Sequence, residues 1–166
     1  MQKIHSLRAA LIEAIPELKA APGALRMWVD RGTVQAPKDA AGITGFAFAF
    51  RVNVLLVEFT GDVAALSLAV LLWLRANQPS LLMPGQDAFA FQVDVLDTTK
   101  VDIEIQIDLK QSVRASSAAQ GYTLAYVAEP APLWGDDQAP GGVIPIPLLK
   151  AVSVAGEGTV IACDGG

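Results

Sequence analysis

The most continuous hydrophobic stretch of the chain runs from Val63 to Leu74, where Ser67 is the single polar residue. A helix at a protein surface normally carries apolar residues at i, i+3, i+4 and i+7, with polar residues on the opposite side. This stretch is apolar on every side until Arg75, and Pro79 ends it. It is also too short to cross a bilayer, which requires about 20 apolar residues. We therefore predict a helix that is held inside the fold or shared with a protein partner.

Alternating apolar and polar positions predict β-strands on both sides of this helix. In the longest one, residues 46–59, Phe46, Phe48 and Phe50 share one face, and the strand spans about 45 Å if extended. Because few small domains bury so long a strand alone, we expect its far end to project or to meet a neighbouring molecule. Gly32 predicts a bulge in the preceding strand. The predicted strands are residues 25–35, 46–59, 89–95, 101–109, 112–115 and 122–127, the last two being a hairpin across SSAAQG.

A helical pattern near the start of the chain predicts a first helix with Ser6 as its N-cap, ending at Pro16. The elements together indicate an α+β fold, a mostly antiparallel β-sheet flanked by two helices. Composition changes at Pro130, where APLWGDDQAPGG is too rich in proline and glycine to continue the sheet. We therefore predict an α+β domain at residues 1–129 and a C-terminal extension at residues 130–166. The extension is expected either to pack on its own domain or to lie on an adjacent subunit.

Composition favours a protein that associates with other proteins. Apolar residues make up 52% of the chain and charged residues 17%, against about 45–50% and 25% in ordinary globular domains. The net charge of −5 argues against sequence-independent DNA binding, which works by neutralising phosphates. The single cysteine, Cys163, excludes an intramolecular disulfide framework and a multi-thiolate zinc site. The first 18 residues lack a secretory pattern, so we do not expect secretion; the protein is expected to be made and kept in a reducing compartment, or to need no disulfide.

Residues suited to catalysis are few. The only histidine, His5, lies near the chain start, and Cys163 has no second histidine to activate it. GxSxG, GxxxxGK[ST] and GxGxxG motifs are absent from the sequence. We therefore predict no catalytic residues, no cofactor and no metal site.

A row of carboxylates is the feature that most resembles a chemical site, and it allows three interpretations. The first is a solvated face of the sheet. The second is a hard-cation site, because oxygen ligands spaced two apart on a strand share a face; a metal-assisted hydrolase would then use Asp94, Asp102 and Glu104. The third is an acidic lumen, in which Asp102, Glu104 and Asp108 line a pore that DNA passes without binding. A small-ligand-binding α+β module is a further alternative, although the loops offer no convergent polar groups.

Several segments, in order, resemble the tail completion protein R (GpR) family of contractile-tailed phages of the Peduovirus type. The similarity covers about three-quarters of the chain and is strongest in LLWLRANQPSLL at residues 71–82. The other matching segments are SLRAAL and PEL within residues 6–18, VDRG at 29–32, the residues Phe48, Asn53, Val57, Phe59 and Gly61, the segment 89–97 and VDIEIQI at 101–107. The segment from Pro130 onward lies outside the resemblance.

The resemblance implies a virion structural protein without enzymatic activity that acts late in tail assembly. Such a protein caps the head-proximal end of the tail and prepares it for joining to the head, and tail-terminator folds form hexameric rings. The implied partners are other copies of the chain, the tail tube or sheath protein and the head connector, without a membrane. A ring requires two different faces of each subunit to meet. From the hydrophobic pattern we predict that Phe46, Phe48, Phe50, Leu72, Trp73 and Leu74 form this subunit interface.

Overall fold

The computed structural model describes residues 1–36, 44–118 and 121–129. Most of residues 36–45, between the first two predicted strands, and the whole predicted extension at residues 130–166 lie outside the described residues. The described elements are α1 (Gln2–Ala14), α2 (Pro16–Ala20), β1 (Leu25–Gln35), β2 (Gly45–Phe59), α3 (Val63–Asn77), β3 (Ala90–Val95), β4 (Val101–Ala118) and β5 (Gly121–Tyr126), with two short 3₁₀ turns, Pro22–Ala24 and Pro79–Leu82.

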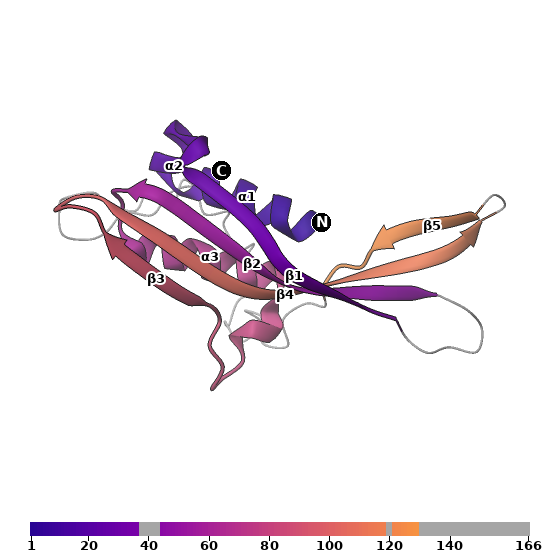
Figure 1. Ribbon diagram of the computed structural model, residues 1–166. Coiled ribbons are helices and arrows are strands. Elements are labelled where there is room, and N and C mark those ends of the chain that lie inside the picture. The colour runs from indigo at the N-terminus through magenta and orange to yellow at the C-terminus, as the bar shows by residue number, and fades with distance from the viewer. Residues whose placement is uncertain (37–43, 119–120, 130–166) are drawn as a thin grey trace, which may run out of the picture.

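The strands form one antiparallel sheet in the order β1-β2-β4-β3, and β5 pairs with the far half of β4 (Figure 1). β4 is the organising strand, since β2 runs along one of its edges while β3 and β5 share the other. The helices lie on one face of this sheet. We call that face the helix-side face and the opposite one the open face. The predicted α+β class, a mostly antiparallel sheet with flanking helices, is confirmed.

The core lies between the helices and the helix-side face. Its strand residues follow the alternation that the sequence predicts: Val52, Val54 and Leu56 on β2 lie opposite Ile107, Ile105 and Ile103 on β4. α3 contributes Leu66, Val70, Trp73 and Leu74, and α1 contributes Leu7 and Leu11. Because burying such a side chain stabilises the fold by about 1.5–3 kcal/mol, these residues hold the two layers together.

One helix prediction needs correction. α1 begins at Gln2 with Met1 as its N-cap, five residues before the predicted N-cap Ser6, whose hydroxyl instead accepts a hydrogen bond from the Trp73 indole (3.0 Å). Of the two alternatives predicted for α3, complete enclosure within the subunit does not hold, because Leu68 on its outer side is exposed. Asp62 caps α3 by accepting a hydrogen bond from the Ala64 amide. No helix among the described residues is long and apolar enough to cross a membrane.

The strand predictions are correct in position but wrong in one division. The predicted segments 101–109 and 112–115 are a single strand of 18 residues, β4. The predicted bulge at Gly32 is confirmed by a register shift between Val29 and Gly32. A second shift lies between Leu56 and Phe59, where Glu58 has a φ of 52° and its amide donates to the Asp102 carboxylate (2.8 Å).

Candidate functional site

Part of the sheet projects beyond the helices. In Figure 1 the β4–β5 hairpin and the adjoining ends of β1 and β2 extend past α1 and α3. The Thr44 carbonyl accepts a hydrogen bond from the Ala115 amide (2.9 Å), which continues the β2–β4 pairing into this region. We call residues 31–36, 44–48, 110–118 and 121–127 the β-arm. The sequence prediction that the long second strand projects from the domain is therefore correct.

The helix-side face of the β-arm is largely apolar, and its outer part is exposed, whereas Gln111 and Val113 near its base are buried. Register places Val34 beside Phe48 and places Leu124 and Tyr122 of β5 beside Ala115 and Ser117 of β4. The exposed fractions of Val34, Tyr122 and Leu124 are 64%, 68% and 59%. Phe46 and Phe48 are half-buried and pack edge to face, with ring centroids 5.3 Å apart. Contiguous exposed apolar surface of this kind is typical of a protein-binding surface.

The structure divides the six residues predicted for the subunit interface into two groups. Phe46 and Phe48 lie on the β-arm, and Leu72 is half-buried on α3. Phe50, Trp73 and Leu74 instead belong to the core of the subunit, with at most 6% of each residue exposed. Phe48 is half-buried and packs against the edge of this core, and the Trp73 indole donates a hydrogen bond to the Ser6 hydroxyl. Phe50, Trp73 and Leu74 are therefore buried within the single subunit, and a subunit interface at the six residues stays a prediction.

The three carboxylates predicted to line a lumen lie together on the open face of β4, and each has a partner. Asp108 forms a bidentate ion pair with Arg51, in which two guanidinium nitrogens each lie 2.8 Å from one carboxylate oxygen. This guanidinium lowers the pKa of Asp108, and the same hydrogen bond raises the pKa of Arg51. Asp102 accepts the Glu58 amide, and Glu104 accepts a hydrogen bond from Gln106 (3.1 Å). The row is therefore partly neutralised, and its role in a lumen stays a prediction.

The rival metal site receives no support from the geometry. Asp94 lies directly opposite Asp102, whereas the residue opposite Glu104 on β3 is the uncharged Gln92. Among residues 1–36, 44–118 and 121–129, no group of three or more His, Cys, Asp or Glu side chains is placed to hold a metal ion.

An open groove of about 730 Å³, which the sequence did not predict, crosses the open face. The groove is lined by Arg31 at the β1 bulge, by the Arg51–Asp108 pair and Lys110, and by the segment that follows α3. These residues are far apart in sequence, so the strand patterns alone could not bring them together. The groove is where the small-ligand alternative would have to act, although its charged groups come from strands rather than from loops.

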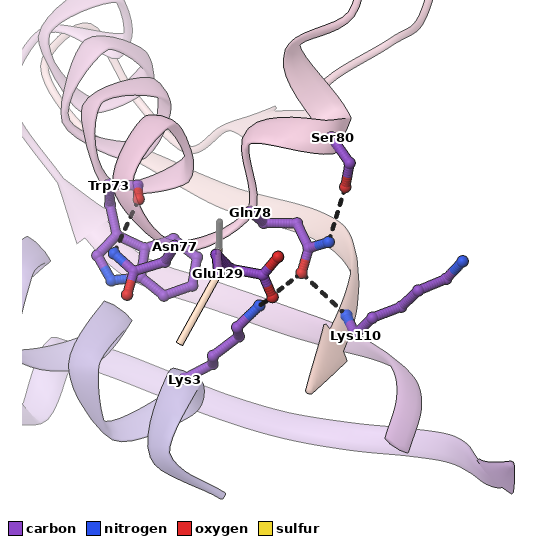
Figure 2. Close-up of polar contacts among 7 residues, drawn as sticks. All are labelled: Lys3, Trp73, Asn77, Gln78, Ser80, Lys110 and Glu129. Carbon is purple, nitrogen blue, oxygen red and sulfur yellow. Dashed lines mark hydrogen bonds and ion pairs between the residues drawn. The ribbon is translucent and has the colours of Figure 1, made fainter. Parts of the chain in front are cut away.

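A buried polar cluster fixes the base of the β-arm to the helices (Figure 2). The Lys3 ammonium, from α1, lies between the Gln78 side-chain oxygen (2.7 Å) and the Glu129 carboxylate (2.5 Å). The same Gln78 oxygen accepts the Lys110 amide (3.1 Å), and the Gln78 nitrogen donates to Ser80 (2.8 Å). Lys110 lies on the stretch of the β4 edge between β3 and β5, so Gln78 takes the place of a neighbouring strand there. Sequence reasoning missed this cluster, whose members are up to 126 residues apart.

Comparison with known proteins gives a family match over the part of the chain that contains these features. The P2 phage tail completion protein R (GpR) family matches residues 1–130. The chain is 33% identical over 135 residues to tail completion protein R of Escherichia phage P2, covering 80% of this chain and 86% of that protein. No solved structure matches the chain significantly. The chain therefore belongs to the P2 phage tail completion protein R family and is a phage tail completion protein of the virion.

Proposed function

We propose that this protein completes the tail at its head-proximal end, where it caps the tube or sheath and prepares it for joining to the head. It performs this role as a structural component and not as an enzyme. Family membership supports the role in tail completion. The observation that carries the proposal is the β-arm, on whose helix-side face Val34, Tyr122 and Leu124 are exposed in the single subunit. An apolar surface of this kind is stabilised when another protein covers it.

In this proposal several copies join into a closed ring on the end of the tail, and the resemblance to tail-terminator proteins suggests six. A ring uses two different surfaces of each subunit, so that each copy meets one neighbour on either side. The β-arm supplies one of these surfaces, with Phe46 and Phe48 at its base. The open face then lines the lumen, where those carboxylates of the Asp102, Glu104 and Asp108 row that a neighbouring copy leaves uncovered disfavour phosphate binding, while Arg51 neutralises much of the Asp108 charge.

The other partners follow from the position at the neck of the particle. We infer contacts with the tail tube or sheath protein on one side of the ring and with the head connector on the other. Apart from its first residue, the C-terminal extension at residues 130–166 lies beyond the family match, and it is proposed to add contacts specific to this virus. DNA passes through the lumen without specific binding.

The test is complementation of a phage that lacks this gene. Supplied in trans, the natural protein should restore plaque formation, and without it electron microscopy of lysates should show separate tails and filled heads. Replacing Leu124 with Glu places a charge on the apolar face of the β-arm and should abolish rescue. The matched control is Thr123→Gln, an uncharged replacement on the opposite, exposed face of the same strand. Normal head–tail joining without the gene would overturn the proposed function.

A further inference from the structure

The two ends of the subunit carry opposite charge. The β-arm contains three basic residues and no acidic residue: Arg31, Lys110 and Arg114. The other end of β4, together with β3 and the turn that joins them, comprises residues 87–104, which we call the β3 end. It contains one lysine, Lys100, and five acidic residues: Asp87, Asp94, Asp97, Asp102 and Glu104. Lys100 forms an ion pair with Glu58 (2.7 Å), which lies outside the β3 end. Because its charge is taken up by Glu58, the five carboxylates leave the β3 end strongly acidic.

The β3 end also carries apolar side chains that its own subunit leaves exposed. Phe91 and Val95 are 58% and 70% exposed, and Leu96 in the following turn is exposed as well. Register places Phe91 opposite Ile105 and Val95 opposite Val101, so both point toward the helix-side face. An edge strand with such residues is a common site for pairing with another chain.

The two ends match each other on both faces of the sheet at once. On the helix-side face, the β-arm presents Tyr122 and Leu124, and the β3 end presents Phe91 and Val95. The open face carries the charges: Lys110 and Arg114 on the β-arm, and Asp94, Asp102 and Glu104 on the β3 end. A copy that keeps its helices on the same side as its neighbour therefore places apolar residues against apolar residues and basic residues against acidic ones.

We propose that the β-arm of one copy docks on the β3 end of the next copy. This inference rests on the proposed function and names the second surface that the ring requires. A contact between two β-arms would bring Arg114 and Lys110 of both copies together, which like-charge repulsion opposes. A contact between unlike ends repeats from copy to copy and closes into a ring when the rotation between copies permits.

Site-specific cross-linking tests the contact. In a Cys163→Ser background, one chain carries Leu124→Cys and another carries Val95→Cys, and they are mixed and oxidised as purified protein and as assembled tails. The mixture should give cross-linked dimers, whereas each variant alone should give none. The control mixture pairs Val95→Cys with Thr123→Cys, on the opposite face of β5, and should stay uncross-linked. Cross-linking of Leu124→Cys alone, or absence of cross-links in the mixture, would overturn the proposal.

Charge exchange supplies an independent test. Replacing Lys110 and Arg114 with Glu, or Asp94 and Glu104 with Lys, should weaken self-association about tenfold or more in each variant alone, because both ends then carry the same charge. Mixing the two variants should restore association, since each altered end then meets its opposite. If neither variant changes association and the natural gene still restores plaques, the contact is wrong while the proposed function stands. If the gene is dispensable for tail completion, the proposed function fails whatever the cross-links show.

Discussion

Removing Glu129 should destabilise the protein more than removing the lysine that it binds. Lys3 and Glu129 form a pair in which the side chains are only 8% and 21% exposed. Replacing Glu129 with Ala leaves the ammonium buried, with the Gln78 side-chain oxygen still accepting its hydrogen bond. Breaking a buried pair in this way costs about 3–5 kcal/mol, and because Glu129 is still partly exposed we expect about 2–3 kcal/mol.

The converse replacement, Lys3→Met, fills similar space without a charge. The freed Glu129 carboxylate can turn toward water, and the Gln78 oxygen still accepts the Lys110 amide. We therefore expect a loss of only about 1 kcal/mol, the usual net value of a hydrogen bond. The double variant should resemble Lys3→Met, so that the two losses are not additive.

Urea unfolding, at a protein concentration where the chain is monomeric, measures these differences. With a slope near 2 kcal/mol per molar urea, Glu129→Ala should lower the midpoint by about 1–1.5 M. The matched control is Glu13→Ala, because the Lys19–Glu13 pair (3.3 Å) is more than 60% exposed on both sides and should contribute less than about 0.5 kcal/mol. Equal losses for Lys3→Met and Glu129→Ala, or strictly additive ones, would refute the reasoning.

Three further predictions concern stability. Leu66→Ala, at a fully buried position of α3, should cost about 3–5 kcal/mol in urea unfolding, whereas Leu68→Ala on the exposed side of the same helix should cost less than about 1 kcal/mol; similar losses would contradict the assignment of the buried side. Gly45→Ala should be destabilising, because a Cβ there would lie 2.7 Å from the Val113 carbonyl oxygen, while Gly23→Ala meets nothing within 4 Å and should be neutral or slightly stabilising in thermal unfolding. Asp108→Asn should be slightly less stable than the parent at neutral pH. Hydrogen bonding to Arg51 lowers the pKa of Asp108, so this contribution is present above the ordinary carboxyl pKa and is lost as pH falls through the lowered value; a difference that persists in strong acid would rule out this ion pair as its source.

Local periodicity was sufficient to predict the strands and their faces. Ile103, Ile105 and Ile107 alternate with polar residues, and all three are buried on the predicted face. The division of β4 into two strands failed at Lys110, Gln111 and Ser112, three consecutive polar residues that interrupt the alternation. Gln111 is nevertheless buried on the helix-side face, so the strand continues through it.

The functional surface could be predicted only in part, because it depends on which part of the sheet the helices cover. Phe48 and Phe50 lie on the same face and follow the same pattern, yet Phe50 is buried in the core while Phe48 is only half-buried at its edge. Trp73 is likewise a residue type that often anchors interfaces, but α1 covers it. The contact is a hydrogen bond from the Trp73 indole to Ser6, which is 67 residues away in sequence. The charge partners of the carboxylate row are equally remote, since Arg51 is 57 residues from Asp108.

The most direct test of the account is a cryo-electron microscopy map of the neck of the intact particle. The account predicts a closed ring of this chain at the head-proximal end of the tail, with the apolar face of each β-arm covered by the β3 end of the adjacent copy. A map that places the chain elsewhere in the particle, or that shows Tyr122 and Leu124 facing solvent in the assembled tail, would contradict it.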